Sequence, residues 1–341
     1  MTSQPAVGDL GERALIERIR ARVPPAPPWV HVGIGDDAAV VEPERNTLDV
    51  VTTDALIEGV HFQRAWATPE AIGHKALAVS LSDLAAMGAA PRVALLSLGL
   101  PPEMAVADVD GLLDGLLALA KRFGTALVGG NIARSPGPLV VDLVAIGSVR
   151  RRRLLRRSGA RPGDVVVVSG SVGAAAAGLA SCQGRAEAGA AGREPVAPAA
   201  CEARFLRPEP RVRLGLLLGR GQVASACIDL SDGLGDGLRQ LASASGVGLV
   251  IEAGAIPVDE DARCWFTGRG QDAADAACTG GEDYELLFTV PPRRLRAFEA
   301  VRRLIGDLTC TRIGTITADP ALIWRRAGTA GPLPAGFAHF R

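Results

Sequence analysis

Residues 68–101 read TPEAIGHKALAVSLSDLAAMGAAPRVALLSLGLP. The opening TPE is typical of a helix start, because threonine caps a first turn and proline fits the first helical position. Gly88 and Pro91 end the helix, since neither residue favours its continuation. The apolar run over 92–101 then predicts a buried strand. This predicted helix followed by a strand is the pattern from which we predict the fold class.

Helices and strands also alternate before and after residues 68–101. Apolar segments predict strands over 47–59, 126–131 and 139–149, and helical spacing of apolar residues predicts helices over 9–22 and 103–123. In the second half, the segments DVVVVSG, SACIDL, VGLVIEA and ELLFTV read as further strands, with helices between them. Helices that alternate with strands indicate the α/β or α+β class.

The chain has 341 residues, which is long enough for two domains. Composition changes most sharply at the basic run over 149–164, VRRRRLLRRSGARPGD. We therefore predict two domains, the first over 1–150 and the second over 151–341. Residues 181–201 are rich in Ala, Gly and Pro and have weak apolar periodicity, which predicts a mobile or poorly ordered insertion.

Composition excludes several classes of partner. Lys plus Arg equals Asp plus Glu at 37 each, so no net charge favours nucleic acid or an anionic membrane. The six cysteines are scattered without a CxxC pair, which is typical of reduced thiols. The N-terminus lacks the apolar core of a signal peptide, and no segment approaches the roughly 20 apolar residues of a membrane span. We expect a cytoplasmic protein that binds a small molecule.

Residues 31–41, HVGIGDDAAVV, place Asp36 and Asp37 side by side in a small, apolar run. The pattern suggests that both carboxylates are buried where a strand begins. A buried, uncompensated carboxylate costs several kcal/mol or changes its protonation state. Some partner is therefore expected to compensate this pair.

Four more aspartates stand at strand ends or on a buried helix, near Ser or Thr hydroxyls. They are Asp54, Asp83, Asp229 and Asp232. Hard divalent cations such as Mg²⁺ prefer oxygen ligands of this kind, usually together with phosphate oxygens. The alternative is that aspartates form turns or cap helices. That alternative suits Asp36 or Asp232 taken alone, but it suits Asp83 less, because a mid-helix residue caps nothing.

Familiar catalytic motifs are missing from the sequence. It contains no GxxxxGK[ST] phosphate loop, no GxSxG and no HExxH, and GSVGAAAAG at 170–178 reads as a tight turn. Of the four histidines, His61 in EGVHF is the candidate for the site, while His31, His74 and His339 read as structural or surface residues. Phosphoryl transfer needs positioning and charge neutralisation more than covalent chemistry. We therefore predict no catalytic nucleophile and no general base.

Several motifs together resemble the thiamine-monophosphate kinase family. They are GIGDDAAV, TTDALIEGVHF, KALAVSLSDLAAMGAAP, RSGARPGD, CIDLSDGLGDGL and GGEDYELLFTV, in order between about residues 9 and 290. That family belongs to the superfamily of aminoimidazole ribonucleotide synthetase. The resemblance implies a two-domain PurM-like fold, with an α+β N-terminal domain and an α/β C-terminal domain. It also implies a homodimer whose N-terminal sheets form a barrel, and transfer of the ATP γ-phosphoryl group to thiamine monophosphate with several Mg²⁺ ions.

The resemblance also implies roles for individual residues. The residues at the positions of the family's metal ligands are Asp37, Thr52, Thr53, Asp54, Asp83, Asn131, Asp229 and Asp232. Those at nucleotide contacts are Gly130, Asn131, Arg157 and Ser231, and those at substrate contacts are His61, Glu282 and Phe337. The resemblance makes Mg²⁺ the partner expected to compensate the acids at 36–37, with Asp37 as the direct ligand.

The sequence departs from the family pattern at two places. Asn131 stands where the family usually has an aspartate, which leaves an amide oxygen but no charge for the metal. Pro334 stands near the usual place of an aromatic residue that stacks on the substrate, with Phe337 as a possible substitute. Two alternatives stay open: a related ATP-dependent enzyme with another acceptor, and a nucleotide-binding homologue that has lost catalysis.

Overall fold

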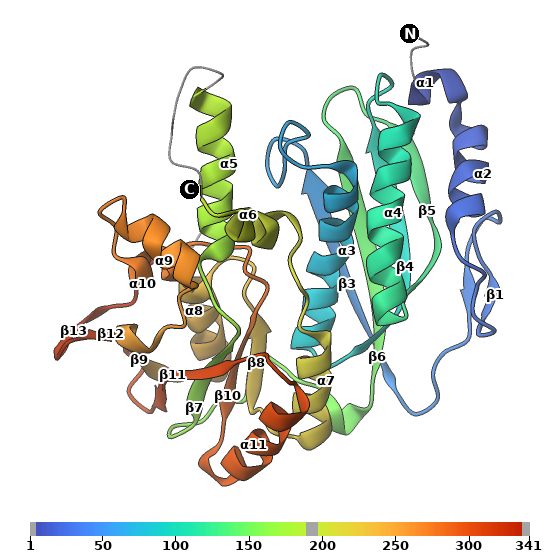
Figure 1. Cartoon of the computed structure of the whole chain (residues 1–341). Coiled ribbons are helices and arrows are strands. Elements are labelled where there is room, and N and C mark those ends of the chain that lie inside the picture. Colours follow the sequence, from blue (N-terminus) through green and yellow to red (C-terminus); the bar gives the residue numbers. More distant parts are fainter. Residues whose placement is uncertain (1–4, 189–196, 336–341) are drawn as a thin grey trace. The chain divides into compact units, whose positions relative to one another are not determined.

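The computed structural model describes residues 5–188 and 197–335 and divides them into two compact units (Figure 1). The first unit comprises the residues up to Leu84 together with Ala90–Arg150. The second comprises Ala85–Ala89 and the residues from Arg151 onward. In residues 5–188 and 197–335, no helix is long and apolar enough to cross a membrane.

The first unit is built on a four-stranded sheet with the order β3-β6-β4-β5. Its strands are β3 (Leu48–Ile57), β4 (Ala90–Leu100), β5 (Ala126–Arg134) and β6 (Val140–Val149). β6 pairs antiparallel with β3 and with β4, and β4 pairs parallel with β5. Buried and more exposed residues alternate along β3 and β6, so the sheet has one buried face and one open face.

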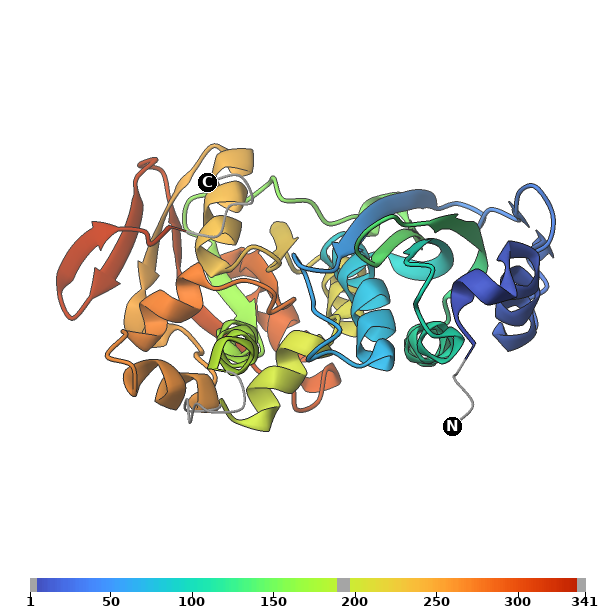
Figure 2. The same cartoon turned by 90° about the horizontal axis from the view of Figure 1, so that it is seen from above.

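Two long helices, α3 (Pro69–Ala86) and α4 (Val106–Phe123), cover the buried face; Figure 2 shows both on the same side of the sheet. They pack closely because each carries a glycine at the contact. A Cβ atom on Gly73 would lie 1.8 Å from the Leu112 carbonyl oxygen, and one on Gly115 would lie 1.9 Å from the Glu70 carbonyl oxygen. The remaining elements are α1 (Val7–Leu10), α2 (Glu12–Arg22), β1 (Val30–Val32) and β2 (Val40–Val41).

The second unit is built on a seven-stranded sheet with the order β13-β12-β9-β11-β7-β10-β8. Its strands are β7 (Val165–Ser169), β8 (Ala226–Asp229), β9 (Gly248–Glu252), β10 (Leu286–Val290), β11 (Cys310–Thr317), β12 (Leu322–Arg326) and β13 (Thr329–Pro332). The β12–β9 pair is parallel and the other pairs are antiparallel. The sheet is therefore mixed, with antiparallel pairs in the majority.

Helices pack on both faces of this sheet. The helices are α5 (Ala174–Ala188), α6 (Ala199–Leu206), α7 (Val212–Gly221), α8 (Leu234–Ser245), α9 (Glu260–Thr267), α10 (Ala273–Thr279) and α11 (Leu295–Leu304), with short 3₁₀ turns η1 (Arg151–Arg153), η3 (Ala253–Ala255) and η4 (Pro292–Arg294). Leu287 of β10 belongs to the core that α5, α8, α9 and α10 share with the strands. The next residue, Phe288, points to the other face and meets Phe298 of α11 edge-on, with ring centroids 5.6 Å apart.

The expectation that residues 181–201 form a mobile or poorly ordered insertion is wrong at both ends of that segment. Helix α5 continues to Ala188, and α6 begins at Ala199. The Ser181 hydroxyl donates to Glu202 (2.8 Å) and accepts from the Ala197 N–H (3.0 Å), so the two helices are joined. Alanine favours a helix even without strong periodicity, which explains the error. Residues 189–196 lie outside the described part of the chain.

The predicted fold class is confirmed, because each unit combines a mixed sheet with helices. The helix and strand predicted from residues 68–101 correspond to α3 and β4. The helix predicted over 9–22 is interrupted at Gly11, which separates α1 from α2 and has a φ of +78°.

Candidate functional site

In the first unit, β3 and α3 bring two predicted acids together. Thr52 and Asp54 lie two positions apart on β3, so both side chains point toward α3. The Thr52 hydroxyl donates to Asp83 of α3, and the Ser80 hydroxyl donates to Asp54 with a 2.7 Å separation. Ser80 and Asp83 are three residues apart and therefore share a helix face. Two carboxylates and two hydroxyls thus meet between one strand and one helix.

The electrostatics of this group favour a cation. The pKa of Asp54 is raised to about 6, chiefly by burial and then by the negative charges of Asp83 and Asp142, while the hydrogen bond from Ser80 acts in the opposite direction. Ionised Asp54 is therefore higher in free energy here than an ionised aspartate in water. A positive ion beside these residues would lower that free energy.

Asp142 of β6 is an acid near this group that the sequence analysis did not select. Its carboxylate accepts a hydrogen bond from the Thr53 hydroxyl at 3.1 Å. The strand alternation in LVVDLVAIGSV gives the only sequence signal, since it places Asp142 on the opposite face from its buried neighbours. What the sequence does not contain is the register between β6 and β3, which sets Asp142 diagonally across from Thr53.

Asp36 and Asp37 are both exposed, so the expectation that they are buried is wrong. They lie in the turn between β1 and β2 rather than at the start of a strand. The Asp37 N–H donates to the Asp36 carboxylate at 2.9 Å, so Asp36 serves as a turn residue. Within the described residues, no hydrogen bond or ion pair joins Asp37 to Asp54 or Asp83.

His61 lies in the loop that follows β3. Its Nδ1 accepts a hydrogen bond from the Ile57 N–H at 3.1 Å, so the neutral ring carries its proton on Nε2. The buried Lys75 of α3 donates to the His61 carbonyl oxygen at 3.1 Å. Glu58 fixes the same loop, because its carboxylate accepts from Arg64 at 2.8 Å and from the Leu139 N–H at 3.0 Å.

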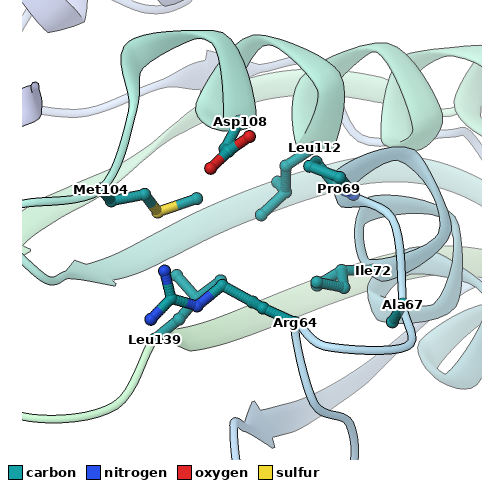
Figure 3. Close-up of a pocket in the computed structure, with 8 residues that line it drawn as sticks. All are labelled: Arg64, Ala67, Pro69, Ile72, Met104, Asp108, Leu112 and Leu139. Atoms are coloured by element: carbon teal, nitrogen blue, oxygen red, sulfur yellow. The ribbon is translucent and has the colours of Figure 1, made fainter. Parts of the chain in front are cut away.

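A small pocket lies beside this loop (Figure 3). It is lined by Arg64, Ala67, Pro69, Ile72, Met104, Asp108, Leu112 and Leu139. Figure 3 shows the Arg64 guanidinium and the Asp108 carboxylate as the charged groups of a mostly apolar lining. None of the residues predicted from the sequence lines this pocket, so it is distinct from the acidic group.

Gly130 and Asn131 lie on β5, beside β4. A Cβ atom on Gly130 would lie 1.8 Å from the Leu96 carbonyl oxygen, so the close pairing of β4 and β5 requires glycine there. Asn131 is exposed and pairs with Ser97 of β4. Gly130 therefore has a structural role that does not depend on any ligand.

In the second unit, two predicted motifs are neighbours. Asp229 ends β8 and pairs with Leu286 of β10. Beyond this pair, the Glu282 N–H donates to the Ser231 carbonyl oxygen at 2.6 Å, which ties the SDGL turn to the GGEDYEL turn. Glu282 and Tyr284 have φ values of +68° and +50°, a left-handed backbone that costs energy for residues other than glycine. Asp229, Ser231, Asp232 and Glu282 thus belong to one pair of adjoining turns.

Arg157 and the C-terminal segment both attach to α8, the helix that begins after Asp232. The exposed Arg157 donates to Gln240 at 2.6 Å. Arg239 donates to the carbonyl oxygens of Leu333 (2.7 Å) and Pro334 (2.5 Å). Phe337 lies outside the described residues, so its predicted place is not tested.

The donor atoms of the predicted metal ligands are all oxygens, which suits Mg²⁺. Among residues 5–188 and 197–335, no three His, Cys, Asp or Glu side chains form a ready-made metal centre. Mg²⁺ commonly binds through one or two carboxylates and completes its shell with water and phosphate oxygens. The carboxylates and hydroxyls around Asp54 and Asp83 fit that mode of binding.

Two family models match the chain. They describe AIR synthase related proteins, the N-terminal domain over residues 35–149 and the C-terminal domain over residues 161–325. Thiamine-monophosphate kinase of Salmonella typhimurium is 42% identical over 311 residues, which cover 91% of each chain. The Escherichia coli K12 kinase is 39% identical over 334 residues, which cover 97% of this chain and 98% of the other.

Solved structures of thiamine-monophosphate kinases are also similar to this chain. Thiamine-monophosphate kinase from Stenotrophomonas maltophilia K279a superposes with a TM-score of 0.79 at 40% identity, covering 93% of this chain and 96% of the other. AaThiL complexed with AMPPCP and TMP has a TM-score of 0.75 at 32% identity over the whole of both chains. The hydrogenase maturation protein HypE in complex with ATP, at 18% identity, covers 98% of each chain with a TM-score of 0.76 and shares the fold alone.

Proposed function

We propose that this chain, which belongs to the thiamine-monophosphate kinase family, transfers the γ-phosphoryl group of ATP to thiamine monophosphate and so makes thiamine diphosphate. The observation that carries the proposal is 42% identity to a kinase of that name over 91% of both chains. A structural neighbour of full coverage is complexed with AMPPCP and TMP, which supports the same pair of substrates.

The chemistry explains why a site without a nucleophile is sufficient. The acceptor is a phosphate whose second pKa is about 6, so at neutral pH its oxygen is already largely ionised and needs no general base. The main obstacle is repulsion between two polyanions, which bound Mg²⁺ would neutralise. In the first unit, the residues proposed to hold Mg²⁺ are Asp37, Thr52, Thr53, Asp54, Asp83 and Asn131; in the second unit they are Asp229 and Asp232.

The other proposed residues position the substrates. Gly130, Asn131, Arg157 and Ser231 would contact the nucleotide, and Arg157 offers the planar donor fork that suits a phosphate. His61, Glu282 and Phe337 would contact thiamine monophosphate. The hydrogen bond from Ile57 and the Lys75 contact hold the His61 loop, so that Nε2 is the ring's donor when the ring is neutral.

We further propose that the chain forms a homodimer through the open face of the first unit's sheet, with the two sheets closing a barrel. Val51 on that face is 63% exposed, and the half-buried Leu95, Val144 and Ile146 share it. An apolar face of this kind is typical of a surface that a partner covers. The cytoplasm remains the proposed location, since all six cysteines are free thiols.

The test is to incubate the purified chain with ATP, Mg²⁺ and thiamine monophosphate and to separate the products by chromatography. We expect thiamine diphosphate, and we expect Asp83→Asn to reduce its formation at least about 100-fold, as loss of a charge-stabilising group typically does. Asp49→Asn, which removes one exposed carboxylate elsewhere on β3, is the control and should keep wild-type activity.

Two results would contradict the proposal in different ways. Binding of ATP without any product from thiamine monophosphate, but with turnover of another acceptor, would indicate a different substrate. Binding of ATP with no turnover of any acceptor, even after Asn131→Asp restores the acid, would indicate a chain that has lost catalysis.

A further inference from the structure

Asp142 lies on the open face of the first unit's sheet, in a row that crosses all four strands. Asp142 of β6 is paired with Ala55 of β3 on one side and with Ser97 of β4 on the other, and Ser97 is paired with Asn131 of β5. Neighbouring strands are about 4.8 Å apart, so roughly 10 Å separates the Asp142 and Asn131 backbones. The small side chain of Ser97 stands between them.

The surroundings of Asp142 give its charge little compensation. Its carboxylate accepts one hydrogen bond, from the neutral Thr53 hydroxyl at 3.1 Å. Among the described residues no Lys, Arg or His forms an ion pair with Asp142, and the carboxylate repels Asp54. The neighbouring residues on the open face of β6, Val140 and Val144, are apolar. Neither of them offers Asp142 a hydrogen bond or a positive charge.

We propose that Asp142 is a further ligand of a divalent cation, which it binds together with Thr53 and Asn131. The inference rests on the proposed function, in which Thr53 and Asn131 are already metal ligands. Thr53 is in direct contact with Asp142, and Asn131 shares its row. Asn131 offers an amide oxygen without charge, and the Asp142 carboxylate supplies the negative charge that a hard divalent cation favours.

The experiment measures metal binding rather than turnover. Mn²⁺ is titrated into the protein with AMPPCP present, and free Mn²⁺ is followed by electron paramagnetic resonance. For Asp142→Asn we expect one bound Mn²⁺ to weaken about 10-fold, the lower end of what the loss of a metal-site partner costs. Asp49→Asn, with the same charge change on the open face of β3, should bind as wild type does.

A double variant tests the shared site. Asp142→Asn combined with Asn131→Asp keeps one carboxylate in the row, so its Mn²⁺ affinity should return to within about 3-fold of the wild type, well inside the 10-fold loss expected for the single variant. Circular dichroism and light scattering check that every variant keeps the wild-type fold and mass. Equal Mn²⁺ binding by Asp142→Asn and Asp49→Asn would overturn the proposal.

The same measurements separate this inference from the proposed function. Formation of thiamine diphosphate together with an Asp142→Asn variant that binds Mn²⁺ normally would leave the function standing and reject Asp142 as a ligand. Weakened Mn²⁺ binding by Asp142→Asn, in a wild type that makes no thiamine diphosphate, would support Asp142 and reject the function. A wild type that binds no Mn²⁺ with AMPPCP would overturn both.

Discussion

At the scale of single residues, Glu285 carries the most deeply buried charge among the described residues of the second unit. Its carboxylate accepts hydrogen bonds from Arg204 (2.8 Å), from Arg211 (Nε, 2.7 Å) and from the Ser169 hydroxyl (2.6 Å), and the side chain is 0% exposed. Removing one partner of a buried ion pair leaves the other charge uncompensated, which costs about 3–5 kcal/mol. We expect Glu285→Ala to lower the free energy of unfolding by that amount in urea denaturation.

Glu252→Ala is the matched control for this prediction. Glu252 pairs with Arg325 at 2.7 Å, but both side chains are nearly half exposed. Surface pairs contribute about 0–1 kcal/mol. If Glu285→Ala and Glu252→Ala lowered the free energy of unfolding by similar amounts, burial would not strengthen the Glu285 interactions.

Asp283, two residues before Glu285, gives a prediction about pH. Burial raises its pKa to about 7, although hydrogen bonds from the Gly173 and Ala175 N–H groups and the charge of Arg204 lower it. Between the unfolded value of about 3.8 and pH 7, the folded chain therefore keeps a proton that the unfolded chain loses. This group's contribution to stability is present at low pH and falls as pH rises through that window, by at most about 1.4 kcal/mol per unit.

Asp283→Asn should remove this slope, because the amide does not titrate. Urea midpoints at pH 5, 6 and 8 are compared for the wild type and the variant, so that other titrating groups cancel. Equal changes in the urea midpoints of the wild type and the variant between pH 5 and pH 8 would contradict the assignment.

At the scale of elements, the contact between α3 and α4 decides the shape of the first unit. Gly73 and Gly115 let each helix backbone touch the other. Alanine favours a helix over glycine by about 1 kcal/mol, but overpacking costs about 1–3 kcal/mol or more. The clash is with backbone, which cannot rotate away, so we expect Gly73→Ala to lose about 2 kcal/mol of stability in thermal or urea unfolding.

Gly254→Ala provides the comparison for Gly73→Ala. A Cβ atom on Gly254 would meet nothing within 4 Å, so the same substitution should be neutral or slightly stabilising there. If Gly73→Ala and Gly254→Ala changed the free energy of unfolding equally, the contact between α3 and α4 would have room for a Cβ atom at Gly73.

At the scale of the whole molecule, the open face of the first unit's sheet leads to a prediction about assembly. A dimer formed through this face should have twice the chain mass of 35.2 kDa in light scattering. Val51→Arg places a charge on the proposed contact face and should give the monomer mass, because burying an unpaired charge is costly. Leu304→Arg is the control, since Leu304 is 54% exposed on α11 of the second unit.

The dimer prediction has a clear contrary result. A wild type that runs as a monomer at micromolar concentration, or a Val51→Arg variant that remains a dimer, would show that this face is not the interface. The kinase proposal would then stand on its own test, because thiamine diphosphate formation is measured independently of mass.

The sequence by itself determined the order of most elements and the acidic positions on β3 and α3. Those features depend on local rules: alternation along a strand places Thr52 and Asp54 on one face, and an apolar helix buries the surroundings of Asp83. The family relationship was likewise readable from contiguous motifs. Local patterns were a poor guide to burial in the turn of Asp36 and Asp37, where exposure depends on what the rest of the chain covers.

Only the tertiary structure decided which distant residues meet. Thr53 and Asp142 are 89 positions apart, and their hydrogen bond exists because β3 and β6 pair in one particular register. A shift of one residue would turn Asp142 to the buried face. Register comes from the packing of the whole sheet against α3 and α4, which no single segment encodes. For this reason the strands could be predicted from the sequence, and the row in which Asp142 and Asn131 lie across them could not.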